Sequence, residues 1–219
     1  MRKVLIGTPC HDGKTEVWYN NSLNGTIRQA MQLGIDLHVV YLSYESLVQV
    51  ARNDLMRLAL YEKFHDLIFI DADQEWSPEW VFKLLSLPVD VIGAPVIKKA
   101  DIPAFNVKAL PGGVHVRPDG LAEVECVGTG FMRISNRAMR AVWNDSEKYR
   151  HNDKQGRWVF DVKPVDGDLI SEDNIFCHKW RKLGGKVFID PSMTCGHVGA
   201  KKYTGNFMQF LQQLKPHFQ

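Results

Sequence analysis

Residues 67–73 read Leu-Ile-Phe-Ile-Asp-Ala-Asp, and this stretch decides the fold. Four large apolar residues with no polar alternation predict a strand that is buried on both faces, as in a parallel sheet. Because an unpaired buried charge is costly, we expect Asp71 and Asp73 just past the carboxyl end of this strand, where open α/β sheets bind ligands. Residues i and i+2 of an extended segment point to the same side, so both carboxylates can face one ligand. Such oxygen ligands suit Mg²⁺ or Mn²⁺ bridged to substrate phosphates, although a plain solvated turn is the alternative.

Composition limits the possible classes of protein. The chain has 219 residues, 45% hydrophobic and 24% charged, with a net charge of +2, as in ordinary globular proteins. A net charge this small does not attract the whole protein to nucleic acid or to anionic membranes, although the sequence leaves room for a local basic patch. The apolar part of residues 1–7 is too short for a signal peptide, and no apolar stretch of about 18 residues occurs. We therefore expect a cytoplasmic protein without a membrane anchor. Its four cysteines lack zinc-like spacing and are expected to be reduced.

The first 97 residues alternate between apolar runs and helical stripes. Strands are predicted at 4–7, 37–42, 66–70 and 89–93, and helices at 20–33, 46–64 and 78–87. Ser77 is the expected N-cap of the last of these helices, with Pro78 as its first residue. This alternation predicts an α/β fold with a mostly parallel sheet and right-handed crossovers.

The remaining residues have a different pattern. Short β-like pieces separated by proline and glycine fill residues 98–125, and residues 144–168 are polar and predict a surface excursion. Between and after them we expect an apolar segment at 128–134, helices at 136–143, 171–183 and 206–214, a strand at 186–189 and a loop at 195–199.

Five short motifs stand in a fixed order along the chain. They are the loop after residue 7, Arg52-Asn53-Asp54, Asp71-Ala72-Asp73, Ser171-Glu172-Asp173-Asn174 and Gly196-His197-Val198-Gly199. In this order they resemble the GT-A fold glycosyltransferases, especially compact soluble enzymes of viral and bacterial type. The resemblance implies a single GT-A domain over 1–219, with a Rossmann-like sheet flanked by helices and a smaller acceptor-side β region. Residues 1–97 would bind the nucleotide sugar, and residues 98–219 would supply the acceptor half and a metal loop.

The resemblance assigns donor-binding roles near the start of the chain. Thr8, Pro9 and Cys10 would line the nucleotide pocket, although a simple turn also explains them. Arg52 would contact the base or ribose; a helix residue paired with a nearby acid is the alternative. Of the paired aspartates, the first would hold the ribose and the second the metal, and both can touch the ion.

Later motifs would complete the metal and phosphate sites. The resemblance makes His197 a third metal ligand beside Asp71 and Asp73, with a surface histidine in a tight turn as the alternative. Lys201 and Lys202 would meet the diphosphate, unless they are merely solvated.

The acidic pair at the start of the 171–183 helix supplies the candidates for catalysis. By resemblance, Asp173 would be the general base that deprotonates the acceptor hydroxyl, and Glu172 would hold the acceptor or orient the loop. Acids in a first helical turn also stabilise the helix dipole without any catalytic duty. Gly128 and Gly130 would form a tight passage beneath the donor sugar, unless they mark a β-bulge.

The predicted function is metal-dependent transfer of a sugar from a nucleoside diphosphate sugar, with UDP expected, to an acceptor hydroxyl. The acceptor is a glycan, a small molecule or a hydroxymethylated DNA base. Basic residues that would contact DNA if they converge on one face are Lys98, Lys99, Lys108, Arg117, Arg133, Arg137, Arg140 and Arg150. The alternatives are a nucleotide-sugar-binding module without turnover and a sugar nucleotidyltransferase, whose glycine-rich loop is missing after residue 7. No Gly-x-Gly-x-x-Gly follows the first strand, which argues against a dehydrogenase.

Overall fold

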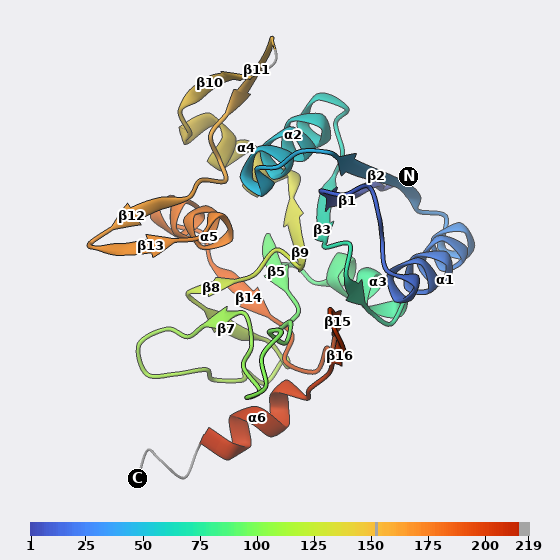
Figure 1. Ribbon diagram of the computed structural model, residues 1–219, viewed down its shortest axis with the longest axis vertical. Helices are drawn as coiled ribbons and strands as arrows, with labels where there is room; N and C mark the ends of the chain where they lie inside the picture. Colours follow the sequence, from blue (N-terminus) through green and yellow to red (C-terminus); the bar gives the residue numbers. More distant parts are fainter. Residues whose placement is uncertain (152, 215–219) are drawn as a thin grey trace.

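The computed structural model describes residues 1–151 and 153–214, and its centre is a seven-stranded sheet (Figure 1). The strands are β1 (Lys3–Cys10), β2 (Asp36–Ser43), β3 (Asp66–Ile70), β5 (Val91–Gly93), β7 (Ala122–Val124), β9 (Phe131–Ser135) and β14 (Val187–Ile189). Their order across the sheet is β2-β1-β3-β9-β5-β14-β7. Strands β2, β1, β3, β5 and β14 run parallel to one another, whereas β9 and β7 run antiparallel to their neighbours. The predicted α/β fold class with a mostly parallel sheet is confirmed.

Strand β3 is buried along its whole length, as its unbroken apolar run predicts. Leu67 and Phe69 pack into the hydrophobic core on one face of the sheet. Ile68 and Ile70 pack into a second core on the other face. Because side chains alternate between the two faces of a strand, β3 contributes to the hydrophobic core on each face of the sheet.

Helices cover both faces of the sheet. On one face lie α1 (Val17–Leu33) and α3 (Glu79–Ser86), and on the other lie α2 (Val48–Tyr61), α4 (Asn136–Asp145) and α5 (Glu172–Lys182). Local sequence sets their ends: Gly34 closes α1 with a φ of 63°, and the Ser135 hydroxyl caps α4 by accepting from the Ala138 N–H at 3.2 Å. A sixth helix, α6 (Phe207–Leu214), follows near the end of the described chain. None of these helices combines the length and apolar character needed to cross a membrane.

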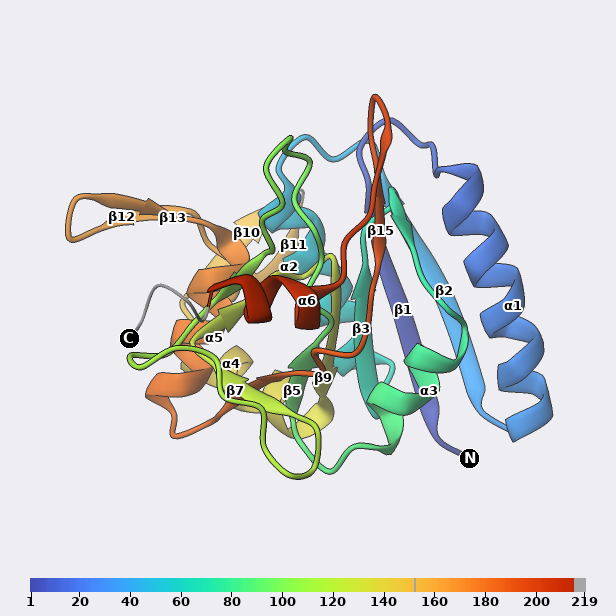
Figure 2. The same ribbon diagram turned by 90° about the horizontal axis from the view of Figure 1, so that it is seen from below.

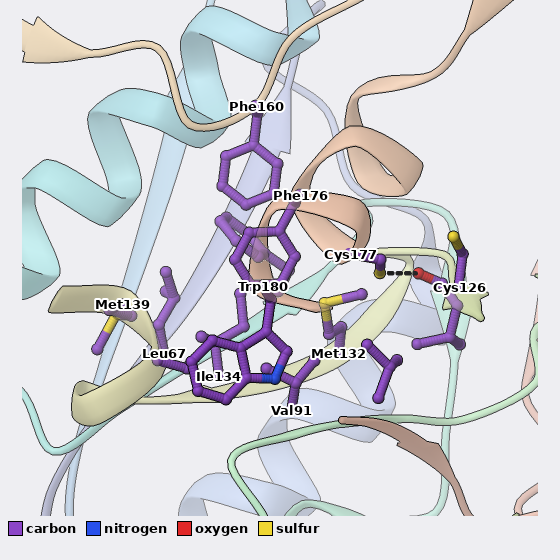
Figure 3. Packing of buried hydrophobic residues seen from close by; sticks show 14 of the residues in the cluster. Leu67, Val91, Cys126, Met132, Ile134, Met139, Phe160, Phe176, Cys177 and Trp180 are labelled. Carbon is purple, nitrogen blue, oxygen red and sulfur yellow. Dashed lines mark hydrogen bonds between the residues drawn. The ribbon is translucent and has the colours of Figure 1, made fainter. Parts of the chain in front are cut away.

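Aromatic side chains fill the core beneath α2 and α5 (Figure 3). Phe160 stacks on Phe176 with ring centroids 5.1 Å apart, and its edge meets Phe69 at 5.3 Å. Cys126 and Cys177 lie close together in the same core (Figure 3). All four cysteines lie in the described chain, are buried and form no disulfide, as expected.

The polar stretch at 144–168 is more than the predicted surface excursion. It contributes two β-ribbons, β10 (Lys148–His151) with β11 (Lys154–Arg157), and β12 (Lys163–Val165) with β13 (Asp168–Ile170). Figure 2 shows the second ribbon projecting away from the body of the protein. Between the ribbons, however, Val159 and Phe160 are fully buried, so the prediction was wrong at these two residues.

One strand of a small three-stranded sheet replaces the loop predicted at 195–199. Strand β15 (Gly196–Val198) pairs on one side with β4 (Gln74–Glu75) and on the other with β16 (Lys202–Tyr203). A further pair, β6 (Val107–Lys108) with β8 (Cys126–Val127), belongs to the hairpin-rich region expected at 98–125. Because β4 directly follows the paired aspartates, its pairing with β15 brings the late histidine motif next to them.

Candidate functional site

A buried arginine organises the carboxyl edge of the sheet. Arg52 of α2 donates through Nη2 to Asp71 Oδ1 at 3.0 Å and through Nε to Glu172 Oε1 at 3.1 Å. Burial opposes its charge, but the two carboxylates outweigh that effect and raise the pKa of Arg52. Its Nη1 atom is buried and has no hydrogen-bond partner in the described part of the chain. The structure thus brings together residues 52, 71 and 172, which are far apart in the sequence.

The two aspartates lie past the end of β3, but the segment that carries them is not extended. The Gln74 N–H donates to the Asp71 carbonyl at 3.1 Å and closes a turn, so the argument from i and i+2 on one side was wrong. In this turn the Asp71 carboxylate contacts Arg52, whereas the Asp73 carboxylate contacts different partners. The two carboxylates therefore serve adjoining parts of the site.

Asp73 lies between a lysine and the predicted late histidine. Its Oδ2 atom is 2.6 Å from the Lys99 ammonium and 3.4 Å from His197 Nε2. Burial opposes ionisation of Asp73, but hydrogen bonds from His197 and Lys99 prevail and lower its pKa to about 2. The His197 ring donates from Nδ1 to the Ile97 carbonyl at 2.8 Å, which fixes the ring and turns Nε2 toward Asp73. These contacts hold the Asp73 carboxylate and the His197 ring next to each other at the edge of the site.

Two cavities adjoin at Arg52 and Asp71. One of about 510 Å³ runs over the ends of β1 and α2 and is also lined by Pro9 and Asp73. The other, of about 440 Å³, is also lined by His197. Its remaining lining residues include Gln74, Lys98, Lys99, Asn106, Thr129, Gly130, Glu172 and Asp173. The Asp73–His197 pair therefore joins one cavity to the other.

The residues predicted to line the nucleotide pocket after the first strand have different environments. Strand β1 runs on to Cys10, so Thr8, Pro9 and Cys10 belong to the strand rather than to the expected loop. Only Pro9 lines the first cavity. The buried Thr8 hydroxyl shares a hydrogen bond with the Tyr19 hydroxyl at 2.6 Å, and the Cys10 thiol donates to the Lys14 carbonyl at 2.7 Å. Burial and the nearby Asp12 charge raise the pKa of that thiol, so Cys10 is a protonated, structural cysteine.

The two acids at the start of α5 make different contacts. Glu172 faces Arg52, and its pKa is raised by burial and by the neighbouring Asp173 charge, against the attraction of Arg52. Asp173 is buried, and its Oδ1 accepts from the Asn174 N–H at 2.8 Å and from the Ser171 hydroxyl. Its Oδ2 accepts a long 3.4 Å contact from Asn106 Nδ2 at the wall of the second cavity. One oxygen of Asp173 is thus held at the start of α5, while the other has only the long contact with Asn106, which also lines this cavity.

The two glycines at 128 and 130 have different surroundings. A Cβ at Gly128 would lie 1.9 Å from Asn106 Nδ2, so this glycine makes room for Asn106. A Cβ at Gly130 would meet only ordinary contacts, the nearest with Asp71 Oδ2 at 3.5 Å, and would narrow the second cavity. Of the two, only Gly130 lines that cavity.

Lys201 and Lys202 are engaged outside both cavities. Lys201 pairs with Asp101 at 3.0 Å, where both side chains are largely exposed. Lys202 pairs with Glu75 at 2.5 Å and lies 4.2 Å from the centre of the Trp18 ring. The cavity lining that they were predicted to supply comes instead from Lys98 and Lys99.

Several lining residues of the second cavity were not among the predicted site residues, and Gln74, Lys99 and Asn106 are those that contact the predicted ones. Lys99 was considered only as a possible DNA contact, because nothing in its sequence context links it to Asp73. Asn106 lies in the region of 98–125 that matched no motif. The side-chain carbonyl oxygen of Gln74, Oε1, is buried and has no hydrogen-bond partner among residues 1–151 and 153–214. This feature can be seen in the structure but not in the sequence.

A second cluster of possible metal ligands lies at the junction of β8 and α5. The ligand atoms of Glu125, Cys126 and His178 all lie within 4.8 Å of one another. Glu125 already pairs with Lys108 at 2.7 Å and with His178 at 3.0 Å. An ion-pair network therefore accounts for the proximity of these side chains without a metal.

The basic residues considered for DNA are largely paired with acids of the protein itself. Arg133 is buried and pairs with Asp66, and most of the others have separate acidic partners. These pairs are Lys99 with Asp73, Lys108 with Glu125, Arg117 with Asp119, Arg137 with Asp90, and Arg150 with Asp153.

Comparison with known proteins supports the fold. No family model matches the sequence, and no curated protein matches it either. Among solved structures the chain is similar to A197 from STIV, with a TM-score of 0.58 and 17% identity over 91% of this chain and 86% of that one. At this identity the likeness shows a shared fold.

Glycosyltransferases are also among the similar solved structures. One is a glycosyltransferase involved in the glycosylation of the major capsid of PBCV-1, with 13% identity, 65% and 66% of the two chains covered and a TM-score of 0.37. Another is S. aureus TarS, residues 1–349, in complex with UDP-GlcNAc, with 14% identity and a TM-score of 0.48. The match covers 95% of this chain but 61% of the TarS chain. Likenesses this low carry no argument about activity, which is argued below from the site.

Proposed function

We propose that this protein transfers a sugar from a nucleoside diphosphate sugar to an acceptor hydroxyl with the help of a divalent metal ion. The observation that carries the proposal is the buried Arg52 Nη1 at the junction of the two cavities, for which the described residues offer no hydrogen-bond partner. An unpaired buried donor on a charged group costs roughly 1–3 kcal/mol or more, so a ligand oxygen at this point is strongly favoured. A donor nucleotide in one cavity and its sugar at the junction would supply that oxygen.

The first cavity suits the nucleotide. It is lined by Pro9 at the end of β1, by Arg52 of α2 and by residues 71–73, among others. In the proposed complex Asp71 accepts from the ribose while remaining paired with Arg52. The donor base is expected to be uracil, from the resemblance of the motifs alone.

Asp73 and His197 fit a Mn²⁺ or Mg²⁺ ion. A metal-bound histidine usually donates its other ring N–H to a carbonyl or carboxylate, as His197 does to Ile97. Asp73 Oδ2 and His197 Nε2 face each other at 3.4 Å, and the Lys99 ammonium already shows that a cation is favoured beside Asp73. The chemistry that such an ion supplies is positive charge next to the leaving diphosphate.

The second cavity suits the acceptor. Asp173 lines it, and in the proposed reaction its Oδ2 atom removes the proton of the attacking hydroxyl. Asn106 orients Asp173 Oδ2, and Glu172 braces Arg52 rather than touching the acceptor. The acceptor is a glycan, a small molecule or a hydroxymethylated DNA base.

Thermal unfolding with nucleoside diphosphates and nucleotide sugars tests the donor and the metal together. Each ligand is added with and without Mn²⁺ to the wild type, to Asp73→Asn and to the control Asp101→Asn, whose carboxylate is largely exposed. A ligand at 100 times its dissociation constant adds about 2.7 kcal/mol of stability, which gives a clear shift in Tm. We expect a shift with one nucleotide that needs Mn²⁺, is lost in Asp73→Asn and persists in Asp101→Asn.

The other outcomes separate the alternatives. A shift without any sugar release or transfer, measured by incubating the nucleotide sugar with the protein and quantifying free nucleoside diphosphate, indicates a binding module. No shift with any nucleotide contradicts the proposal.

A further inference from the structure

The ribbon of β10 and β11 places like charges opposite each other. In its antiparallel register Lys148 is opposite Arg157, and Arg150 is opposite Gln155. Side chains of cross-strand partners share a face, and residues i and i+2 share it too. One face of the ribbon therefore carries three basic residues and one amide. Like charges directly opposite each other destabilise a ribbon, so this arrangement needs a reason.

Within the described residues, no acid pairs with either member of the facing pair Lys148 and Arg157. A cavity of about 610 Å³ lies along the ribbon, lined by Trp143 of α4 and by residues of both strands, and none of its described lining residues is acidic. Arg150 pairs with Asp153 at the turn, 94% exposed, at 3.0 Å, and the half-buried Arg157 donates to the Ser146 carbonyl at 2.7 Å. An anion bound from outside the chain would offset the repulsion between these basic side chains.

The opposite face of the ribbon is fixed to the protein. Tyr149 lies over Gly156, where a Cβ would come within 2.6 Å of the ring, and its edge packs on Trp158 at 5.0 Å. Burial raises the pKa of Tyr149 to about 12, and charges of α2 such as Asp54 act on it. Figure 1 shows the ribbon next to α2 and α4 at the rim of the molecule. Packing on this side holds the basic face toward solvent.

We propose that the basic face of the β10–β11 ribbon binds the phosphates of a single-stranded nucleic acid. Residues i and i+2 of a strand lie about 6.8 Å apart, so Lys148 and Arg150 reach successive phosphates of an extended strand. The half-buried Trp143 ring at the cavity wall offers a surface on which a base stacks. Single-strand binding sites combine these two elements, a basic track and an aromatic platform. This binding needs no donor sugar, so it is independent of the proposed transfer reaction.

Fluorescence anisotropy with a labelled single-stranded oligonucleotide tests the proposal at low and at physiological salt. The variants are Lys148→Glu and, as a matched control, Lys154→Glu. Lys154 lies on the same ribbon with the same charge but is opposite His151, on the other face. We expect Lys148→Glu to weaken binding at least tenfold and to reduce the salt dependence, and Lys154→Glu to weaken it less than threefold.

Stability provides a second readout. Because Lys148→Glu replaces repulsion with attraction toward Arg157, its Tm is expected to stay level or rise while binding is lost. If Lys148→Glu lowers both the affinity for nucleic acid and the Tm, the basic face contributes to folding rather than to binding, and the proposal is overturned. Equal losses in the two variants, or equal affinity for inorganic polyphosphate and for the oligonucleotide, would also overturn it.

Discussion

Asn53 holds the backbone of Phe160 with both ends of its amide group. Its Nδ2 donates to the Phe160 carbonyl at 2.9 Å, and its Oδ1 accepts from the Phe160 N–H at 2.9 Å. The same oxygen accepts from the Val159 N–H at 3.0 Å. One buried side chain on α2, next to Arg52, thus fixes the segment that joins the two ribbons.

Replacing Asn53 with alanine is expected to destabilise the protein strongly. Three buried backbone groups lose their partner, and each such group costs roughly 1–3 kcal/mol when no water reaches it. The free energy of unfolding, measured by urea denaturation, should fall by about 3 kcal/mol or more. Asn24→Ala on the exposed side of α1 is the control and should change it by less than about 0.5 kcal/mol. A similar small change in both variants would contradict the role of Asn53.

The depressed pKa of Asp73 predicts a pH-dependent contribution to stability. Its pKa falls from the ordinary value of 3.8 to about 2 on folding, so the stabilisation is fully present above about pH 4. It declines as the pH falls toward 2, where the folded protein also takes up the proton. The difference in unfolding free energy between the wild type and Asp73→Asn should therefore shrink between pH 4 and pH 2. A difference that stays constant over this range would show that charge on Asp73 contributes nothing.

Lys99 is expected to compete with a metal ion for Asp73. Its ammonium lies 2.6 Å from the oxygen that would bind the ion. Lys99→Ala should therefore bind Mn²⁺ alone, without nucleotide, more tightly than the wild type by about threefold to tenfold in isothermal titration calorimetry. Lys201→Ala, which removes an exposed lysine paired with Asp101, should leave the affinity unchanged. Weaker Mn²⁺ binding in Lys99→Ala would place the ion elsewhere.

Gly128→Ala is expected to lower turnover by displacing Asn106. The new methyl group would lie 1.9 Å from Asn106 Nδ2, which must leave Asp173. In the transfer assay we expect kcat to fall by about tenfold with little change in the KM for the donor. The matched test uses the Asn106→Ala background, where the amide group is gone and only the Cβ of residue 106 remains, 3.2 Å from the new methyl group. Gly128→Ala should have little further effect there. Additive losses in the double variant would show that the two residues act independently.

The sequence predicted those parts of the molecule that depend on local patterns. Apolar runs located the strands, and β3 was predicted at its observed bounds because burial on both faces leaves an unmistakable run at 66–70. The sequence predicts an extended segment after this strand, whereas the hydrogen bond from the Gln74 N–H to the Asp71 carbonyl shows that the backbone turns there. The apolar segment near residue 131 was recognised, but nothing local reveals that it inserts antiparallel between β3 and β5.

Contacts across long sequence distances limited the prediction of the site. The resemblance to known motifs brought Asp73 and His197 together, and the structure places them 3.4 Å apart. Lys99 and Asn106 were missed as site residues because their importance depends on which side chains the β4–β15 pairing and the Gly128 turn place beside them. Such partners follow from the tertiary fold, and no spacing in the sequence encodes them.

The insertion of β9 has a consequence for synthesis of the chain on the ribosome. Strands β3 and β5 are made early, yet the strand that separates them begins only at Phe131, and β14, which covers the other edge of β5, begins at Val187. A nascent chain that stops at residue 97 therefore exposes unpaired edges of two very apolar strands. Such edges invite pairing with other chains until β9 arrives. Shortened fragments that end before β9 should therefore aggregate rather than fold.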